Sequence, residues 1–245
     1  MGPRLDSGVV GFRGTARFEL LSCLGEGAMG VVYEALDHER GTKVALKRLR
    51  NLNLGAIARF KREFRALKDL EHRNLVSLGE LVEDQGHWFF TMELVEGTSF
   101  LDYVRPRPGS GQEPEAPVVL LGRVRNAFRQ VAAGVNALHG AGKVHRDIKP
   151  SNLLVTEEGR VVLLDFGLVT EAFTSPTAAD PQALGTAAYM APEQMASTGV
   201  GPEADWYSVG VVLYQSLTGE LPHDGEPAEI LRKKQTEPAR SPLSI

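Results

Sequence analysis

The stretch that decides the fold is His145-Arg146-Asp147-Ile148-Lys149-Pro150-Ser151-Asn152. It places a carboxylate, an amide and two cations within eight residues. Pro150 removes one backbone donor and disfavours helical geometry at the residue before it, so we predict a rigid loop rather than a helix. In such a loop, the side chains of Asp147 and Asn152 can point into one space.

Two short apolar runs follow this loop. Residues 153–155 and 161–164 are rich in leucine and valine, which predicts a β-hairpin, and the second run ends at Asp165-Phe166-Gly167. A hairpin returns the chain to its starting end, so we expect Asp165 beside Asn152. One carboxylate and one amide carbonyl are hard oxygen ligands that suit Mg²⁺, which completes its shell with water and phosphate.

At these residues the chain resembles the eukaryotic-type protein kinases, whose catalytic and metal-binding loops have this form. The resemblance implies that ATP donates its γ-phosphate to Ser or Thr hydroxyls of proteins, and that Asp147 accepts or orients the hydroxyl proton. It assigns the γ-phosphate to Lys149 and a Mg²⁺ ion to Asn152 and Asp165. The sequence Ala191-Pro192-Glu193-Gln194 is most similar to that of the bacterial members.

Residues 24–33 contain the spacing Gly-x-Gly-x-x-Gly, which alone is weak evidence because dinucleotide-binding folds share it. Those folds need a helix after the glycines, whereas residues 31–35 are β-branched and aromatic, which favours a strand. We therefore predict two strands joined by a glycine turn, whose backbone can close over a triphosphate as in the kinase glycine loop. The resemblance implies nucleotide contacts at Leu24, Gly25, Glu26, Gly27, Gly30, Val32, Ala45, Lys47, Met92, Glu93, Val95, Leu154 and Asp165.

A lysine and a glutamate are expected to form an ion pair in the first half of the chain. In the run 43–49, the strand period of two puts Lys47 and Ala45 on one face. Glu63 lies on or beside a helical apolar stripe over 57–67, where an unpaired carboxylate is costly. Lys47 is the expected partner, and in the resembling family this catalytic pair orients the α- and β-phosphates. A solvated Glu63 at the edge of the stripe is the rival interpretation.

The resemblance predicts an α+β fold with two lobes. The first lobe has a five-stranded antiparallel sheet and one helix, and its last strands are expected at 75–81 and 88–94. Met92 would lie behind the adenine, and backbone groups of Glu93 and Val95 would bond the adenine edge. The predicted domain limits are a flexible leader over 1–17, the first lobe and hinge over 18–95, and a mainly helical second lobe over 96–245 with a Pro-rich loop at 105–117.

Two long helices are expected in the second lobe. From Leu121, apolar residues recur at spacings of three and four up to Gly140, and fewer than three heptads with a glycine stop favour a packed core helix over a coiled coil. Residues 205–219 are mostly apolar on all sides, so we predict a helix buried inside the lobe. The resemblance implies that Asp205 anchors the catalytic loop.

The segment between these features is rich in Thr, Ser, Ala and Pro, and its last part, residues 185–193, matches the family's peptide-binding platform. Lys149 and Thr186 resemble the serine/threonine kinases rather than the tyrosine kinases.

Arg146 precedes the catalytic aspartate, which in this family marks control by phosphorylation. A phosphothreonine offers three acceptor oxygens to such an arginine, so we expect autophosphorylation at Thr174 or Thr177.

The composition is that of an ordinary globular protein of 245 residues, with 42% apolar and 24% charged residues. A net charge of −4 gives no electrostatic case for nucleic acid or an anionic membrane, and the longest apolar run, 209–213, is too short to cross a bilayer. The N-terminus lacks the apolar segment of a signal peptide. The single cysteine, Cys23, excludes an internal disulfide, and we interpret it as a small buried hydrophobe in a reducing, cytoplasmic compartment.

The function predicted is that of a serine/threonine protein kinase. The alternative is a catalytically weak nucleotide-binding scaffold, and a small-molecule phosphotransferase or a dinucleotide oxidoreductase are more distant rivals. In the family, the second lobe continues beyond the equivalent of Ile245 and supplies an arginine that pairs with Glu193, whereas Arg232 and Arg240 come too early in the chain. We therefore expect a second lobe truncated at its C-terminus, with further domains possible in a longer parent protein.

Overall fold

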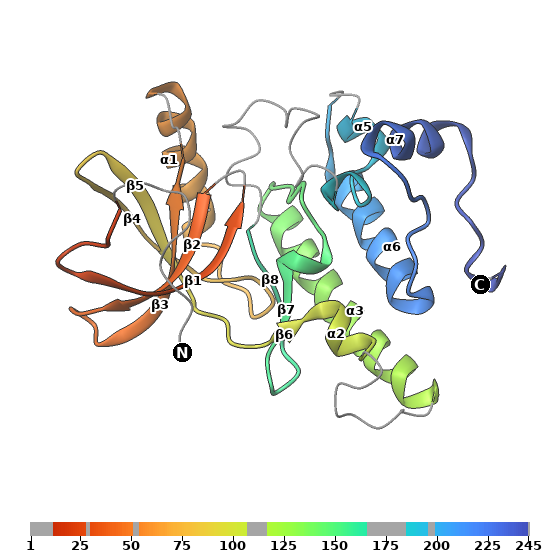
Figure 1. Cartoon of the computed structure of the whole chain (residues 1–245), viewed down its shortest axis with the longest axis horizontal. Helices are drawn as coiled ribbons and strands as arrows, with labels where there is room; N and C mark the ends of the chain where they lie inside the picture. Colours follow the sequence, from red (N-terminus) through yellow and green to blue (C-terminus); the bar gives the residue numbers. More distant parts are fainter. Residues whose placement is uncertain are drawn as a thin grey trace. The chain divides into compact units, whose positions relative to one another are not determined.

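The computed structural model describes residues 12–27, 30–50, 54–106, 117–165, 185–195 and 199–244 (Figure 1). The chain divides into two compact units. Unit 1 contains the described residues up to Glu71 together with Val76–Val95, and unit 2 contains His72–Leu75 together with the described residues from Glu96 onward. The division after Val95 falls where the sequence predicted the end of the first lobe, although His72–Leu75 belong to unit 2.

Unit 1 is built on a five-stranded antiparallel sheet, as predicted, with the strand order β1-β2-β3-β5-β4. The strands are β1 (Phe18–Gly27), β2 (Gly30–Asp37), β3 (Thr42–Leu49), β4 (Leu78–Asp84) and β5 (His87–Met92). One helix, α1 (Leu54–Lys68), follows β3 in the chain. The strand predicted at 75–81 begins only at Leu78, because Leu75 forms a parallel bridge with Leu163 in unit 2.

The two faces of this sheet bury different apolar clusters. One cluster consists of Phe12, Phe18, Ala35, Leu46 and Phe89. The other forms where α1 packs Phe60 and Phe64 against Phe90, with ring centroids 5.8 and 5.6 Å from the Phe90 ring. Phe89 and Phe90 take part in different clusters because neighbouring residues of a strand point to opposite faces.

The flexible leader predicted over 1–17 is wrong for residues 12–17. Phe12 is 9% exposed, and its ring centroid lies 5.4 Å from that of Phe89. The Arg17 guanidinium donates hydrogen bonds to Asp37 at 2.9 and 2.8 Å and to Glu80 at 3.0 and 3.1 Å. One buried aromatic ring and one doubly bidentate arginine therefore tie this stretch to the sheet. Residues 1–11 lie outside the described residues.

The interpretation of Cys23 as a buried hydrophobe is also wrong, because its side chain is exposed. β1 is an edge strand, and its pairing with β2 shifts register between Leu20 and Ser22 and again between Cys23 and Gly25. After the first shift Cys23 pairs with Tyr33 in this edge strand, and its side chain stays exposed there.

Unit 2 is mainly helical and carries a small antiparallel sheet of β6 (Thr98–Ser99), β7 (Leu153–Val155) and β8 (Val161–Leu163). The pairing of β7 with β8 confirms the predicted hairpin. The helical segments are α2 (Phe100–Val104), α3 (Pro117–Gly140), η1 (Pro150–Asn152), α5 (Pro192–Met195), α6 (Pro202–Thr218), α7 (Pro227–Thr236) and η2 (Pro242–Ser244). No helix in the described part of the chain is long and apolar enough to cross a membrane.

α3 is the packed helix that the sequence predicted, although its buried stripe begins later than expected. Val124, Val131, Val135 and Leu138 are buried, whereas Leu121 is 53% exposed.

α6 differs from its prediction, because it is buried on one side rather than on all sides. Val211 and Val212 are buried, but Trp206, Leu213 and Leu217 are between 36% and 43% exposed. Apolar composition predicts burial only where neighbouring elements exist to cover the helix.

Candidate active site

A buried aspartate holds the backbone of the predicted catalytic loop. Asp205, in the first turn of α6, is 0% exposed, and its carboxylate oxygens accept N–H bonds from His145 and Arg146, each at 2.8 Å. The Nε2 atom of His139, in the last turn of α3, lies 2.7 Å from the same carboxylate. These contacts confirm Asp205 as an anchor of the loop.

Arg146 adopts a left-handed backbone conformation with φ of 67°, which is unfavourable for a residue with a side chain. Its N–H group is held by Asp205, and its carbonyl oxygen accepts a hydrogen bond from Gln194 Nε2 at 2.8 Å. The buried His145 imidazole contacts the carbonyl oxygen of Leu164 at 2.8 Å through Nε2. Strained backbone persists where several contacts fix it, and such positions are common at functional sites.

Three predicted site residues meet within the loop. The Asn152 amide nitrogen donates to the Asp147 carboxylate at 2.9 Å and to the Asp147 main-chain oxygen at 2.7 Å. Lys149 Nζ lies 3.0 Å from Asp147 Oδ2 and donates to Thr186 Oγ1 at 2.9 Å. The convergence of Asp147 and Asn152 that the rigid loop predicted is therefore present in unit 2.

The second carboxylate oxygen of Asp147, Oδ1, is buried and has no hydrogen-bond partner among the described residues. Buried acceptors are nearly always hydrogen-bonded, and leaving one unpaired costs about 1–3 kcal/mol. The other oxygen, Oδ2, is already used by Asn152 and Lys149. Oδ1 is therefore the acceptor of this carboxylate that the described residues leave unused.

Asn152 and Asp165 are neighbours through the hairpin. The N–H group of Leu164, the residue before Asp165, donates to the Asn152 main-chain oxygen at 2.8 Å. Because the Asn152 side chain uses its nitrogen on Asp147, its carbonyl oxygen remains for a cation. The described residues contain no group of three or more His, Cys, Asp or Glu able to hold a metal by themselves. A two-oxygen set fits an ion such as Mg²⁺, which takes its other ligands from water and phosphate.

A lysine on α7 fixes the start of the predicted peptide platform. Lys234 Nζ donates to the main-chain oxygens of Ala187, Ala188 and Met190 at 2.8, 2.8 and 2.6 Å. Burial lowers the pKa of Lys234 to about 8. Three carbonyl acceptors match the three donors of an ammonium group, so the lysine ties α7 to this segment.

In unit 1, the glycines of the predicted phosphate loop serve different purposes. A Cβ atom at Gly30 would lie 1.9 Å from the Arg48 main-chain oxygen, so the close pairing of β2 with β3 requires glycine there. At Gly25 an added Cβ would meet no described atom within 4 Å, so packing does not explain that glycine. The Glu26 carboxylate forms an ion pair with Arg50.

Lys47 is 5% exposed and pairs in register with Phe90 of the neighbouring strand. On α1, Phe64 packs against the same Phe90 ring, and Glu63 precedes it with 17% of its side chain exposed. Lys47 and the helix that carries Glu63 therefore both approach Phe90. The Glu63 carboxylate lies 3.7 Å from Arg62 Nε, and its pairing with Lys47 stays a prediction.

The residues predicted to surround the adenine are placed as follows. Met92 is 7% exposed at the end of β5. The Glu93 N–H group donates to the Ser77 main-chain oxygen at 2.9 Å, so a bond from Glu93 to adenine would have to come from its carbonyl group. Leu24 is 50% exposed, whereas Val32, Ala45 and Leu154 are half-buried or buried. Unit 2 contains Leu154 and Asp165 and unit 1 contains the other predicted nucleotide residues, whose roles all stay predictions.

The remaining predictions concern four residues that the structure does not describe and two arginines near the C-terminus. Phe166, Gly167 and the expected phosphorylation sites Thr174 and Thr177 lie outside the described residues. Arg232 and Arg240 pair with Glu237 and Glu220, at 3.1 and 3.0 Å.

The contacts of His139, Gln194 and Lys234 were not predicted from the sequence. Only His139 carries a local signal, as a basic residue type in the last turn of the helix that leads to the catalytic loop.

Comparison with known proteins identifies the family. Residues 18–242 match the protein kinase domain. Serine/threonine-protein kinase PknL of Mycobacterium tuberculosis is 37% identical over 216 residues, which cover 87% of this chain and 52% of that protein. Serine/threonine-protein kinase PrkC of Bacillus subtilis is 34% identical over 224 residues, covering 90% and 33%, and serine/threonine-protein kinase pkn2 of Myxococcus xanthus is 37% identical over 220 residues, covering 85% and 25%. This chain thus spans from about a quarter to about half of the length of these relatives. Given the match over most of its length, the chain belongs to the protein kinase domain family.

Proposed function

We propose that this chain transfers the γ-phosphate of ATP to serine and threonine hydroxyls of proteins, with Mg²⁺ as the metal ion. The family uses ATP and a divalent metal ion in general, and the relatives are named serine/threonine-protein kinases. The observation that carries the proposal is the buried Asp147 Oδ1, which lacks a partner among the described residues and lies beside a lysine and an amide.

The roles of the loop residues follow from their contacts. Asp147 Oδ1 would accept the hydrogen bond of the substrate hydroxyl and orient its oxygen towards the phosphorus, while Asn152 and Lys149 hold the other carboxylate oxygen. The Lys149 ammonium would also stabilise negative charge on the transferred group. Mg²⁺, held by Asn152 and Asp165, would neutralise charge on the phosphates.

The link between Lys149 and Thr186 supports a serine or threonine acceptor. Lys149 Nζ contacts both Asp147 and Thr186, so one ammonium group joins the catalytic carboxylate to the start of the peptide platform. In unit 1 we assign the α- and β-phosphates to Lys47, with Glu63 as its partner, and the adenine to the surroundings of Ala45 and Met92.

We also make proposals about the domains, the location and the partners of the full protein. Because the chain spans only part of its relatives, we propose that further domains accompany it in the full protein. A cytoplasmic location is supported by a sequence with one cysteine and hence no internal disulfide. The net charge of −4 gives no support for a nucleic-acid partner.

A transfer assay with labelled ATP, Mg²⁺ and a protein acceptor tests the activity. We expect incorporation of phosphate on serine or threonine, and a loss of about a hundredfold or more in Asp147→Asn. Asp69→Asn, an exposed carboxylate in unit 1, is the matched control and should keep the wild-type rate. Nucleotide binding without any transfer by the wild-type chain would favour the scaffold alternative.

We also propose autophosphorylation between Thr170 and Thr186, with Thr174 and Thr177 as the main sites. The support is the sequence position of Arg146 beside the catalytic aspartate. Mass spectrometry after incubation with ATP and Mg²⁺ should find phosphate in this segment, and Asp147→Asn should abolish it. Phosphate found only elsewhere in an active chain would contradict the assignment.

A further inference from the structure

Gln194 joins α5 to the catalytic loop through both ends of its side-chain amide. Its Oε1 atom accepts the Ala191 N–H at 3.0 Å, and its Nε2 atom donates to the Arg146 main-chain oxygen at 2.8 Å. The two contacts fix which end of the amide is the oxygen, because a reversed amide would set donor against donor and acceptor against acceptor. Gln194 is half-buried, so these bonds are partly shielded from water.

The contact with Ala191 explains how a glutamine at this position comes to face the loop. α5 begins at Pro192, so Gln194 is its third residue. A glutamine at the third helical position can reach back to the N–H group of the residue before the helix, as in a capping box. This local bond occupies Oε1 and leaves the Nε2 donors for the catalytic loop.

The carbonyl that Gln194 binds belongs to the peptide group before Asp147. The N–H end of the same peptide group, on Asp147, donates to His145 Nδ1 at 3.2 Å. Both ends of the peptide group are therefore held, the N–H by the loop itself and the carbonyl by α5. Because a peptide group is planar, its orientation sets the direction in which the Asp147 side chain leaves the backbone.

Gln194 acts at a point where the backbone is strained. Arg146 has a φ of 67°, and such a conformation persists only where surrounding contacts fix it. Asp205 holds the N–H group of Arg146, and Gln194 holds its carbonyl group. Loss of the Gln194 bond would free the carbonyl to turn, and Asp147 would turn with it.

We propose that Gln194 is a positioning residue for phosphoryl transfer, whose amide couples the placement of α5 to the direction of the Asp147 carboxylate. This role rests on the proposed function. Lys149 makes a second link, on the other side of Asp147 in the sequence, through its bond to Thr186. The platform is thus bonded to the loop before and after the catalytic aspartate, so a change in the platform also changes the direction of Asp147.

Gln194→Glu separates the two contacts of the amide. It keeps the size of the side chain and the acceptor for Ala191, but a carboxylate oxygen then faces the Arg146 carbonyl and repels it. Protonation restores the bond, since a neutral carboxyl group has an O–H donor. The repulsion and partial burial raise the pKa of the introduced carboxyl above its usual value of about 4.3, so protonation begins within an assay range of about pH 5–8.

A transfer assay with ATP, Mg²⁺ and a protein acceptor measures the effect on the full chain. At about pH 8, Gln194→Glu should be roughly tenfold slower than wild type, and the ratio of the two rates should rise as the pH is lowered. The ratio cancels every titration that the two proteins share. Gln194→Met removes both donor and acceptor, so its kcat should be roughly tenfold lower at every pH, while the KM for ATP stays unchanged.

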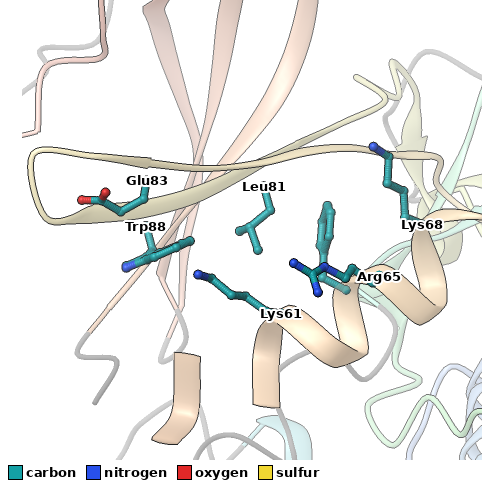
Figure 2. Close-up of a pocket in the computed structure, with 7 residues that line it drawn as sticks. Lys61, Arg65, Lys68, Leu81, Glu83 and Trp88 are labelled. Atoms are coloured by element: carbon teal, nitrogen blue, oxygen red, sulfur yellow. The ribbon is translucent and has the colours of Figure 1, made fainter. Parts of the chain in front are cut away.

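The control is Gln85→Glu, which makes the same charge change at an exposed position between β4 and β5 and should match wild type. A pocket of about 340 Å³ in unit 1 is a separate feature. It lies between α1 and the β4–β5 hairpin and is lined by residues of unit 1, among them Lys61, Arg65 and Trp88 (Figure 2). Gln194 belongs to unit 2, so its variants test the loop without changing a residue of that pocket.

A spectroscopic measurement tests the bond apart from the activity. The backbone N–H resonance of Asp147, in the full chain labelled with ¹⁵N-aspartate, reports on the peptide group whose carbonyl Gln194 holds. We expect it to shift in Gln194→Met and in Gln194→Glu, and in the latter to return towards its wild-type position as the pH falls. Gln85→Glu should leave it unchanged. An unchanged resonance in Gln194→Met would overturn the proposal.

The two measurements separate this role from the proposed function. A resonance that shifts in a chain that transfers no phosphate would uphold the link between α5 and the loop and refute the kinase activity. An active chain in which Gln194→Met keeps the wild-type kcat would refute the positioning role alone. If Gln194→Met does not fold, the isosteric Gln194→Glu decides, and a rate equal to wild type at every pH would count against the role.

Discussion

At the scale of single residues, Asp205 shows how one buried carboxylate sets the geometry of the catalytic loop. It accepts the N–H groups of His145 and Arg146 and contacts His139, and Arg146 keeps a left-handed φ of 67° next to it. The loop therefore relies on contacts supplied by a residue far away in the sequence. Asp147, which follows, is presented by a backbone that is fixed on both sides.

Asp205→Ala should lower the free energy of unfolding by about 2–5 kcal/mol, because two buried N–H groups lose their acceptors. Phosphoryl transfer should fall together with stability, since the same N–H groups position the loop. Urea denaturation and a transfer assay measure the two effects. Asp69→Ala, at an exposed position of unit 1, serves as the control and should change neither. A stable Asp205→Ala protein with full activity would contradict the anchoring role.

At the scale of elements, Lys234 joins α7 to the platform segment through three main-chain oxygens. Lys234→Met keeps the apolar stem but removes every donor, so stability should fall by about 1–3 kcal/mol. We expect the KM for a peptide substrate to rise more than the KM for ATP, because the lysine holds the platform rather than the nucleotide residues. Steady-state kinetics with each substrate varied separately test this. An equal rise of both values would refute the platform role.

Arg17 joins the chain before β1 to the last residue of β2, Asp37, and to Glu80 in β4, and this link predicts a pH dependence of stability. The hydrogen bond from Arg17 lowers the pKa of the buried Asp37 to about 2, from 3.8 in the unfolded chain. A lowered carboxyl pKa stabilises the fold above pH 3.8, and this contribution of about 2 kcal/mol is lost as the pH falls towards 2. Asp37→Asn should therefore be less stable at pH 6 and show a flatter acid profile. Thermal unfolding between pH 2 and 6 measures this, and parallel profiles would disprove the assignment.

At the scale of the whole molecule, the predicted nucleotide residues are divided between the two units. ATP with Mg²⁺ should raise the unfolding temperature, because a ligand at a hundred times its Kd stabilises by about 2.7 kcal/mol. Lys47→Met in unit 1 and Asp165→Asn in unit 2 should each reduce this shift, whereas Asp69→Asn should not. Differential scanning fluorimetry makes the comparison. A full shift in either of the two site variants would remove that residue from the nucleotide site.

Much of the architecture could be predicted because its signals are local. The strand period of two around Lys47 and the apolar stripe on α1 each act over a few residues, and the structure contains the expected sheet and helix. The hairpin β7–β8 was predicted for the same reason. The loop 145–152 was predicted to contain no helix, and this is wrong for Pro150–Asn152, which form a short 3-10 helix that begins at the proline. The approach of Asp147 to Asn152 was predicted from the loop that contains Pro150, and the position of Asp165 beside Asn152 was predicted from the hairpin.

The features that the sequence predictions got wrong depend on contacts between residues that lie far apart in the chain. Cys23 is exposed in the edge strand β1, and Trp206, Leu213 and Leu217 leave one side of α6 partly exposed. Phe12 and Arg17 are tied down by partners in strands that lie far along the chain.

The sequence by itself determined the order of the elements and which residue types stand at the loop that defines the family. Only the tertiary structure decided which N–H groups Asp205 binds in the loop, that Lys234 holds the platform and that three cations of α1 line one pocket with Trp88. The physical reason is that propensity and periodicity act between near neighbours in the chain, whereas hydrogen bonds to buried carboxylates and carbonyls require groups that meet only after the chain has folded.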